Sequence, residues 1–351
     1  MRLADLTQHA GEWLRGGGPM HDVVISTRIR LARNLAGMPF LSRCSDEQKR
    51  DLEGRLRGQL LDADLAPEVF YVDVAAAGDL DRQLLVERQL ISRQHSEADH
   101  PRGVAVTGSE TLSIMVSEED HLRIQVLRSG FQLSEAAEEV RRIDDQLEQK
   151  ISFAFHPQYG YLTACPTNVG TGMRVSVMLH LPALKMTGEI EKVFRAARDM
   201  RLAIRGLYGE GTEATGDFFQ VSNQTTLGKT EEQIVAELCD QCVPNFVNYE
   251  RRARESLCAR RSAGINDKVL RADALLHSAR MISSEETMYL LSLVRLGAHV
   301  GRLGDVDLKL INELFLLTQP AHLQKIHNRQ MDAQERAEAR AAYIRRRLGA
   351  A

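Results

Sequence analysis

The sequence lacks the features of a membrane, secreted or strongly basic protein. No apolar run approaches the roughly 18 residues of a membrane span, and the first residues contain no hydrophobic stretch typical of a secretory signal. The five cysteines are few, odd in number and widely spread, which fits a reducing cytoplasm better than a disulfide framework. Lys and Arg number 45 and Asp and Glu 48, a net charge of −3. We therefore expect a cytoplasmic protein that binds neither nucleic acid nor membranes.

Common signatures of metal and nucleotide binding are also missing. Cys239 and Cys242 form a CxxC pair, but neither a second such pair nor a histidine pair accompanies it, as a structural zinc site would require. The glycine-rich segment at 165–174 contains no Gly-Lys-Ser/Thr of a P-loop and no GxGxxG that opens a helix. We expect no metal held by protein side chains, and any nucleotide must be bound by other means.

The length and composition indicate a globular protein. The 351 residues correspond to two or three domains of about 150 residues. Alternating apolar and polar residues predict strands at 112–116, 122–126 and 175–181, with further strands at about 202–207 and 218–221. Helical spacing predicts helices from Ser45 (capping box with Gln48), at 134–150 (Ser134 as N-cap), 187–200 and from Thr230 to about 262. This mixture favours an α+β fold, a mostly antiparallel sheet flanked by helices.

The order of the elements suggests a division into domains. From about residue 255 the pattern is almost purely helical. We expect a short N-terminal segment at 1–22, an α+β domain at 23–254 and an all-helical C-terminal domain at 255–351. A continuous helix that links the two larger parts near 250–262 is the alternative.

Two segments concentrate charge at predicted strands. In the first, Arg28 and Arg30 alternate with apolar neighbours, so both point to one face of a strand. Two guanidinium groups on one face suit an anion between them, and arginine suits phosphate; a solvated strand face is the alternative. In the second, three carboxylates follow one another at 118–120, which marks either a turn or an acidic catalytic loop.

Two further segments are loops rich in glycine. Cys165 begins the first, in which Gly170 and Gly172 lie among hydroxyl and amide side chains and could approach an anion closely. Its thiol is either reactive or simply a buried apolar group. The second loop, 205–213, follows a predicted strand and contains three glycines. It is either a mobile loop that closes over a reacting centre or an ordinary surface turn.

The four segments together indicate phosphoryl transfer. They contain five arginines apart from Arg33, which suit a polyanion such as a nucleoside triphosphate. A fixed cationic clamp stabilises the charge that develops on a transferring phosphoryl group. Carboxylates among these arginines would repel the phosphate. Their presence is explained if the group that accepts the phosphoryl is a cation, which carboxylates bind.

These segments resemble the motifs of the phosphagen (guanidino) kinases, the arginine and creatine kinase family, over about 22–250. Within that family the chain is most similar to the bacterial protein arginine kinases (McsB-type). Only about 22 residues precede the first motif, where kinases of small substrates carry a helical domain. The stretches 176–184 and 227–232 and the helical C-terminal part also match this subgroup. The resemblance implies a phosphagen-kinase-like catalytic domain at 23–254.

The resemblance implies roles for individual residues. Glu119 and Glu210 match the two carboxylates that flank the acceptor guanidinium, and Cys165 matches the thiol beside it. The phosphate-binding arginines correspond to Arg28, Arg30, Arg123, Arg174 and Arg205. The residues expected to line the ATP site are Ser26, Thr27, Arg28, Ile29, Arg30, Gln89, Arg123, Arg174, Val175, Ser176, Val177, Met178, Arg205, Gly206, Leu207, Tyr208, Gly209 and Glu210. Mg²⁺ would be held mainly by the nucleotide and water.

The chain departs from its relatives at two of these positions and at one position of a C-terminal motif. Gln89 occupies the place of a nucleotide-contacting histidine and cannot be charged, and Met178 replaces a histidine of the small-substrate kinases. Arg336 and Arg340 resemble an allosteric phosphoarginine motif of the subgroup, but its aspartate is Ala337 here. A solvated basic helix is the alternative interpretation of this segment.

The resemblance implies an ATP-dependent protein arginine kinase that marks proteins for degradation by a Clp-type machine. The implied partners are protein substrates, a zinc-binding activator protein (McsA-like), a Clp ATPase–protease and a second copy of the chain in a homodimer. There are two alternatives. One is a kinase of free arginine or another small guanidino compound, and the other is a phosphoarginine-binding adaptor without turnover.

Overall fold

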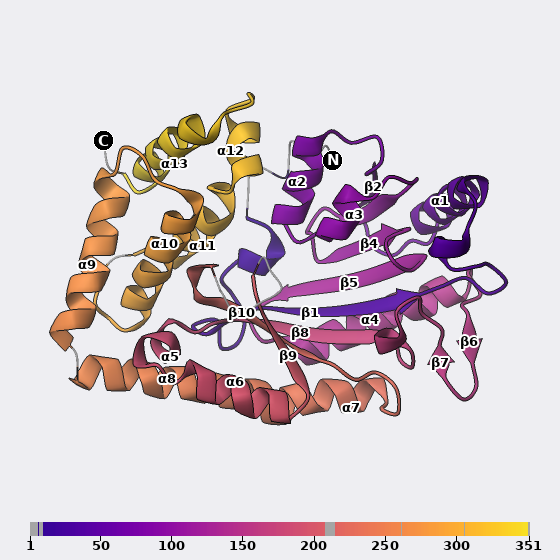
Figure 1. The fold of residues 1–351 in the computed structure, drawn as a ribbon, viewed down its shortest axis with the longest axis horizontal. Helices are drawn as coiled ribbons and strands as arrows, with labels where there is room; N and C mark the ends of the chain where they lie inside the picture. The colour runs from indigo at the N-terminus through magenta and orange to yellow at the C-terminus, as the bar shows by residue number, and fades with distance from the viewer. Residues whose placement is uncertain (1–5, 7–9, 208–214, 261, 305, 350–351) are drawn as a thin grey trace.

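The computed structural model describes residues 6, 10–207, 215–260, 262–304 and 306–349. An eight-stranded antiparallel sheet, in the order β2-β3-β4-β5-β1-β8-β10-β9, is flanked by helices, and an all-helical part packs at one end (Figure 1). The strands are β1 (Val24–Arg33), β2 (Val69–Asp73), β3 (Gly103–Thr107), β4 (Leu112–Val116), β5 (Leu122–Ser129), β8 (Met173–His180), β9 (Leu202–Gly206) and β10 (Phe218–Asn223). The predicted α+β class and the predicted strands are confirmed.

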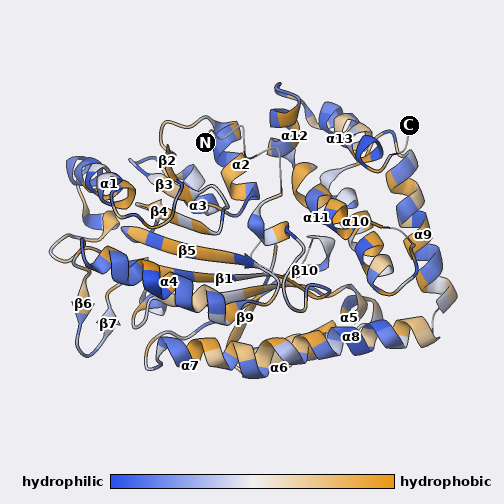
Figure 2. Cartoon of the chain, turned by 180° about the vertical axis from the view of Figure 1, so that it is seen from behind, coloured by the Kyte–Doolittle hydropathy of each residue, from blue (hydrophilic) through white to orange (hydrophobic). Residues whose placement is uncertain are grey.

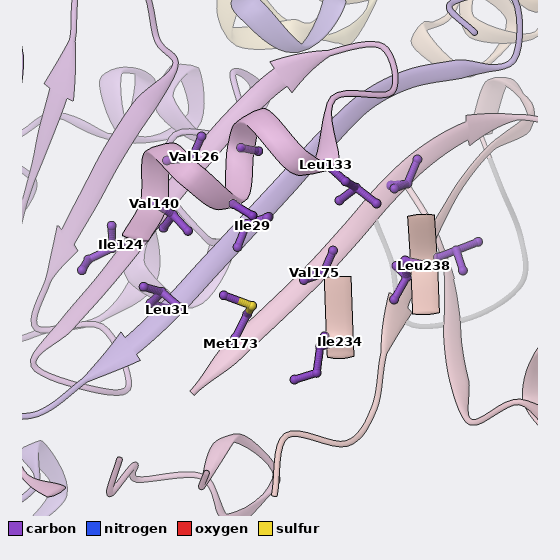
Figure 3. Close-up of a cluster of buried hydrophobic side chains, with 14 of the residues drawn as sticks. Ile29, Leu31, Ile124, Val126, Leu133, Val140, Met173, Val175, Ile234 and Leu238 are labelled. Atoms are coloured by element: carbon purple, nitrogen blue, oxygen red, sulfur yellow. The ribbon is translucent and has the colours of Figure 1, made fainter. Parts of the chain in front are cut away.

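One face of the sheet forms the main hydrophobic core. Ile29 and Leu31 of β1 point to this face, beside Val126 of β5 and Val175 of β8 (Figure 3). The covering helices are α1 (Asp46–Leu61), α4 (Leu133–Glu148), α6 (Ile190–Asp199), α7 (Glu231–Ala236) and α8 (Val243–Arg260). Figure 2 shows α4 lying across the sheet with a largely hydrophilic outward surface. Along the middle of β1, β5 and β8, the other face carries polar side chains, among them Arg30, Arg123 and Arg174.

The helix predictions were correct in kind and differ at some ends. Capping boxes begin α1 at Ser45 and α7 at Thr230, as predicted. Ser134 is not an N-cap, because α4 starts one residue before it and follows Gln132, which makes no side-chain cap. The expected helix at 187–200 corresponds to α6, and a short helix that was not predicted, α5 (Pro182–Thr187), ends before it at Gly188, whose φ is +75°. Left-handed backbone of this kind is the usual end of a helix.

The remaining helices lie on the other face and at the C-terminal end. α2 (Asp79–Glu87) and α3 (Arg93–Glu97) pack near β3 and β4, and a π-helical turn, η6 (Glu237–Cys242), joins α7 to α8. The C-terminal helices are α9 (Ser262–Ser278), α10 (Ser284–His299), α11 (Leu308–Leu317), α12 (Pro320–Ile326) and α13 (Ala333–Arg347). They share a core with Ile25, Leu127 and Phe218 of the sheet. None of the described helices is long and apolar enough to cross a bilayer.

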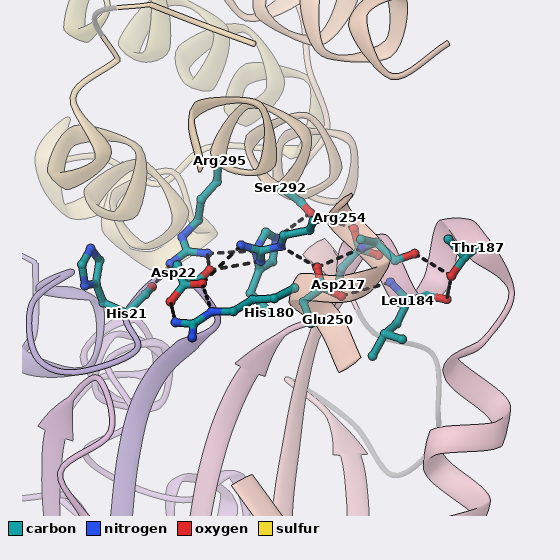
Figure 4. Close-up of polar contacts among 12 residues, drawn as sticks. His21, Asp22, His180, Leu184, Thr187, Asp217, Glu250, Arg254, Ser292 and Arg295 are labelled. Atoms are coloured by element: carbon teal, nitrogen blue, oxygen red, sulfur yellow. Dashed lines mark hydrogen bonds and ion pairs between the residues drawn. The ribbon is translucent and has the colours of Figure 1, made fainter. Parts of the chain in front are cut away.

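A buried polar network joins the C-terminal helices to the sheet (Figure 4). Arg295 of α10 donates hydrogen bonds to Asp22 O (3.1 Å) and to His180 Nδ1 (2.9 Å). His180 Nε2 lies 2.8 Å from Ser292 Oγ, which donates to Asp217 Oδ2 at 2.7 Å. Because Arg295 occupies Nδ1, the ring is a neutral tautomer that donates through Nε2. The network therefore depends on a neutral histidine.

We expect acidification from pH 7.5 to pH 5.5 to destabilise the fold. Burial lowers the pKa of His95 to about 4 and holds the pKa of His180 well below its ordinary value. Both rings stay neutral when folded, whereas the unfolded chain protonates them near pH 6.5 (about the ordinary value) and so binds more protons. The lost stability is roughly 1.4 kcal/mol for each ring at pH 5.5, about 3 kcal/mol together.

Urea unfolding at the two pH values measures this difference in the free energy of unfolding. In a His95→Gln variant, the difference should shrink by roughly 1.4 kcal/mol, the contribution of that one ring. An unfolding free energy that does not change between pH 7.5 and pH 5.5 would contradict the prediction.

Candidate active site

Four strands bring the five predicted phosphate-binding arginines to one face of the sheet. Arg30 of β1 lies directly opposite Arg174 of β8, and Ala32 lies opposite Arg123 of β5. Directly paired residues of antiparallel strands share a face. Arg205 of β9 reaches the same face through its pairing with Gln220 of β10, which is in turn opposite Met178. The strand register thus gathers arginines that are up to 177 residues apart in the sequence.

Four of the five arginines on this face carry positive charge without a paired carboxylate in the described part of the chain. Within the described residues, Arg28, Arg30, Arg174 and Arg205 form no ion pair with a carboxylate. Burial, reinforced by repulsion from neighbouring arginines, lowers the pKa of Arg28 to about 10 and that of Arg30 well below its ordinary value. Arg30 Nε has no hydrogen-bond partner among the described residues. Such a set of guanidinium groups is suited to a polyanion.

Arg28 is held by neutral groups. Its guanidinium donates to Gln89 Oε1 at 3.1 Å, to Gln220 Oε1 and to Ser176 Oγ. Gln89, the predicted departure from a histidine, therefore lies at the site and contributes an uncharged acceptor. These contacts orient Arg28 without cancelling its charge.

Two adjacent glutamates behave differently. Glu118 is buried and accepts from Arg123 Nη1 (2.7 Å) and Ser92 Oγ (2.6 Å). Burial raises its pKa, but Arg123 and Ser92 outweigh that effect and the pKa is lowered overall. Glu119 is 35% exposed and receives one longer bond of 3.2 Å from Arg123. Burial raises the pKa of Glu119, which Arg123 only partly offsets. A carboxylate with a raised pKa at a cleft is suited to accept a proton.

Glu119 and Cys165 line one cleft with the arginines. We call this cleft, of about 190 Å³, the arginine cleft; its charged and thiol residues are Arg30, Glu119, Arg123, Cys165, Arg174 and Arg205. Cys165 Sγ lies 3.0 Å from Thr167 Oγ1. The cleft therefore joins a carboxylate suited to a guanidinium with four cations suited to phosphate.

Asp120 fixes the two loops of the cleft relative to each other, a role that sequence reasoning missed. Its Oδ1 accepts from Ala164 N and from Asn34 Nδ2, both at 2.7 Å. Asn34 Oδ1 in turn accepts from His121 N at 2.9 Å. The position of Asp120 between Glu119 and His121 was its only signal in the sequence.

A second cavity continues along β1 on the same face. We call it the β1 pocket; it is lined by Trp13, Ser26, Arg28, Gln89, Leu127, Ser176, Met178 and Gln220. Ser26, Arg28, Gln89, Ser176 and Met178 were predicted to line the ATP site. Trp13, Leu127 and Gln220 were not, because nothing in the local sequence links them to the motifs.

Several predicted ATP-site residues have side chains elsewhere. Ile29, Val175 and Val177 point into the core on the opposite face, and Thr27 Oγ1 donates to Gly130 O at 2.7 Å. These four can reach a ligand only through neighbouring residues. Gly206 ends β9 and Leu207 packs in the core shared with the C-terminal helices. Tyr208, Gly209 and Glu210 lie outside the described residues.

The two arginines of the proposed allosteric motif are in different environments. Arg340 is 3% exposed and donates to the carbonyl oxygens of Thr318 (2.8 Å) and Ile282 (2.9 Å). Arg336 donates to Met331 O and lines a cavity of about 610 Å³ together with residues of α2, α3 and α12. Arg340 is thus committed to the backbone, whereas Arg336 faces a space that a ligand could enter.

Comparison with known proteins identifies the class. Residues 55–253 match the family described as ATP:guanido phosphotransferase, C-terminal catalytic domain. The duplicated taurocyamine kinase of Schistosoma mansoni, solved with transition-state-analogue components, is similar with a TM-score of 0.60 and 28% identity over 72% of this chain and 35% of that one. Lombricine kinase shares the fold with a TM-score of 0.57, covering 71% and 70% of the two chains. The fold is that of a guanidino phosphotransferase, a class whose description names ATP.

The C-terminal part and full-length relatives narrow this class. Residues 262–351 match the family described as Protein-arginine kinase McsB C-terminal domain. The protein-arginine kinase of Symbiobacterium thermophilum is 48% identical over 96% of both chains. That of Bacillus subtilis (strain 168) is 41% identical over 99% of this chain and 96% of its own. The chain belongs to the protein-arginine kinase family, as the resemblance of its motifs predicted.

Proposed function

We propose that this protein transfers the γ-phosphoryl group of ATP to a guanidino nitrogen of arginine residues in proteins. The observation that carries the proposal is the arginine cleft, which Glu119 lines together with four arginines. Of these four, only Arg123 is paired with carboxylates of the described residues, those of Glu118 and Glu119. The relatives named protein-arginine kinase support proteins as the source of the acceptor arginine.

The chemistry follows from the properties of the acceptor. A guanidinium has a pKa above about 12, and its delocalised nitrogens are poor nucleophiles. Glu119 would hold this cation and take one N–H proton while the nitrogen attacks the γ-phosphorus and the bond to the ADP oxygen breaks. Arg30, Arg123, Arg174 and Arg205 would hold the phosphoryl oxygens in line, so positioning and electrostatics supply most of the rate.

Two further contributions belong to the same proposal. Glu210 would fix the plane of the acceptor guanidinium from the second side, and Cys165 would lie beside it. The described residues hold no group of three or more histidine, cysteine, aspartate or glutamate side chains suited to a metal ion. Mg²⁺ bound with ATP would therefore take its ligands mainly from the nucleotide and water and would neutralise phosphate charge.

We also propose the broader setting implied by the family. The protein would act in the cytoplasm as a homodimer, with a zinc-binding activator and a Clp ATPase–protease that degrades the marked proteins. Its domains would be 23–254 and 255–351, because the two family matches end at 253 and begin at 262. Arg336, which faces a cavity, would be the main phosphoarginine contact of the C-terminal part, and Arg340 would support the backbone around it.

Mass spectrometry of an unfolded model protein incubated with the enzyme and Mg-ATP tests the function. Samples must be kept from acid because the P–N bond is acid-labile, and free arginine is assayed in parallel. Phosphoarginine on the protein supports the proposal. If free arginine is phosphorylated and the protein is not, the enzyme is a small-substrate kinase instead. If the chain binds ATP but forms neither product, even with an activator present, it is a phosphoarginine-binding adaptor instead.

A further inference from the structure

The N-terminal segment closes one end of the β1 pocket with the single tryptophan of the chain. Trp13 lies in a short 3₁₀ turn, η2 (Glu12–Leu14), that packs on β1 and β5; this is the indigo segment between the sheet and the C-terminal helices (Figure 1). Its side chain is 2% exposed, and its Nε1–H has no hydrogen-bond partner among the described residues. A buried indole N–H usually finds a partner. Trp13 therefore lines a pocket while carrying an unused donor.

The direction of β1 indicates which part of a nucleotide reaches this pocket. Arg30 lies in the arginine cleft beside Glu119, where the γ-phosphoryl group would react. Arg28 and Ser26 follow at two-residue steps on the same face and line the β1 pocket. At about 3.3 Å per residue, Ser26 lies about 13 Å from Arg30 along the strand. The phosphates then occupy the arginine cleft, and the nucleoside extends toward Trp13.

The lining of the β1 pocket suits a purine base. Trp13, Leu127 and Met178 offer apolar and aromatic surface, and Gln89 and Gln220 offer neutral amides. Aromatic side chains bind the π-face of a base, and amides can hydrogen-bond its edge. None of the residues that line the pocket is acidic, so nothing there repels the adjoining phosphates.

We infer that Trp13 is a nucleotide-binding residue that contacts the base of ATP and contributes to the choice of nucleobase. The pocket measures about 10 Å³, which holds no more than one water molecule. A base can therefore enter only if Trp13 or its neighbours move, and nucleotide binding must change the surroundings of the indole. The inference rests on the proposed function, because it takes the arginine cleft as the phosphate end of an ATP site.

The single tryptophan makes this inference directly measurable. Titration of the full chain with Mg-ADP or Mg-ATP should change the intrinsic tryptophan fluorescence in a saturable way. By calorimetry, Trp13→Leu should weaken ATP binding by about 10- to 100-fold, the usual worth of one base–aromatic contact. Inorganic tripolyphosphate, which carries the phosphates without the base, should bind the variant and the natural chain equally. The preference for ATP over GTP should also fall in the variant.

Leu14→Ala is the matched control, because Leu14 is fully buried in the same turn but does not line the β1 pocket. It should leave the ratio of ATP to tripolyphosphate affinity unchanged. If Trp13→Leu lowered the affinities for ATP and tripolyphosphate equally, or left the ATP affinity unchanged, the role of Trp13 would be overturned. The proposed function would remain intact. If the natural chain bound neither ATP nor tripolyphosphate, the proposed function itself would fail.

Discussion

Replacement of Glu119 by glutamine is expected to reduce phosphoryl transfer by about 10²- to 10⁴-fold, the usual worth of a positioned general base. Glutamine keeps the shape of the side chain and can still accept the 3.2 Å hydrogen bond from Arg123. It can neither take a proton nor attract the acceptor cation. The rate constant for transfer to an unfolded protein, measured in single-turnover experiments, should therefore collapse while the unfolding midpoint changes little.

The control for this experiment is Glu191→Gln. Glu191 is an exposed residue of α6, which covers the opposite face of the sheet. It should have full activity. If Glu119→Gln retained more than about a tenth of the natural rate, Glu119 would not be the base, and another group of the cleft would have to accept the proton.

Replacement of Arg30 by methionine is expected to lower activity by about 10²- to 10³-fold, the usual loss when one electrostatic stabiliser is removed. The stability of the fold should not fall with it. Burial is the main cause of the lowered pKa of Arg30, and repulsion from the neighbouring Arg28, Arg123 and Arg174 lowers it further. Removing the charge relieves this repulsion, and methionine retains most of the side-chain volume. Activity and unfolding free energy should therefore change independently, or in opposite directions.

Arg33→Met on the same strand should give the contrasting result. Arg33 is fully buried and paired with Asp144, with Nη2 to Oδ2 at 2.6 Å, on the core face of β1. Its loss leaves a buried carboxylate without a partner, which costs about 3–5 kcal/mol. Urea unfolding of the two variants measures the difference. Equal destabilisation by Arg30→Met and Arg33→Met would show that Arg30 is structural and would contradict its assignment to the phosphate clamp.

Local features of the fold could be predicted because they depend on neighbouring residues. The capping boxes at Ser45 and Thr230 place a side-chain acceptor three residues from its backbone donor, so the sequence alone specifies the start of each helix. The alternation around Arg28 and Arg30 likewise identifies a strand with one charged face. Ser134 misled because a good capping residue was present, but the chain continues the helix one residue before it.

The short helix α5, which ends just before α6, was missed for a related reason. Gly188 fits a helix pattern as well as it fits a helix end, and only its left-handed backbone in the folded chain distinguishes the two. The carboxyl network of the cleft was missed as well. Asp120 lies in a run of three acidic residues, and only the approach of Ala164 and Asn34 shows which of them binds backbone and which faces the cleft.

The sequence by itself determined the class of protein and the chemistry of its motifs, because five arginines, Glu119 and Cys165 occur in segments whose order and spacing are specific to guanidino kinases. Only the tertiary structure decided which of these side chains meet. Strand register places Arg30 opposite Arg174 and turns Ile29 and Val175 into the core, and the packing of η2 on β1 and β5 brings Trp13 to the β1 pocket. Such pairings join residues far apart in the chain, and they are fixed by the packing of the whole sheet, which no local pattern records.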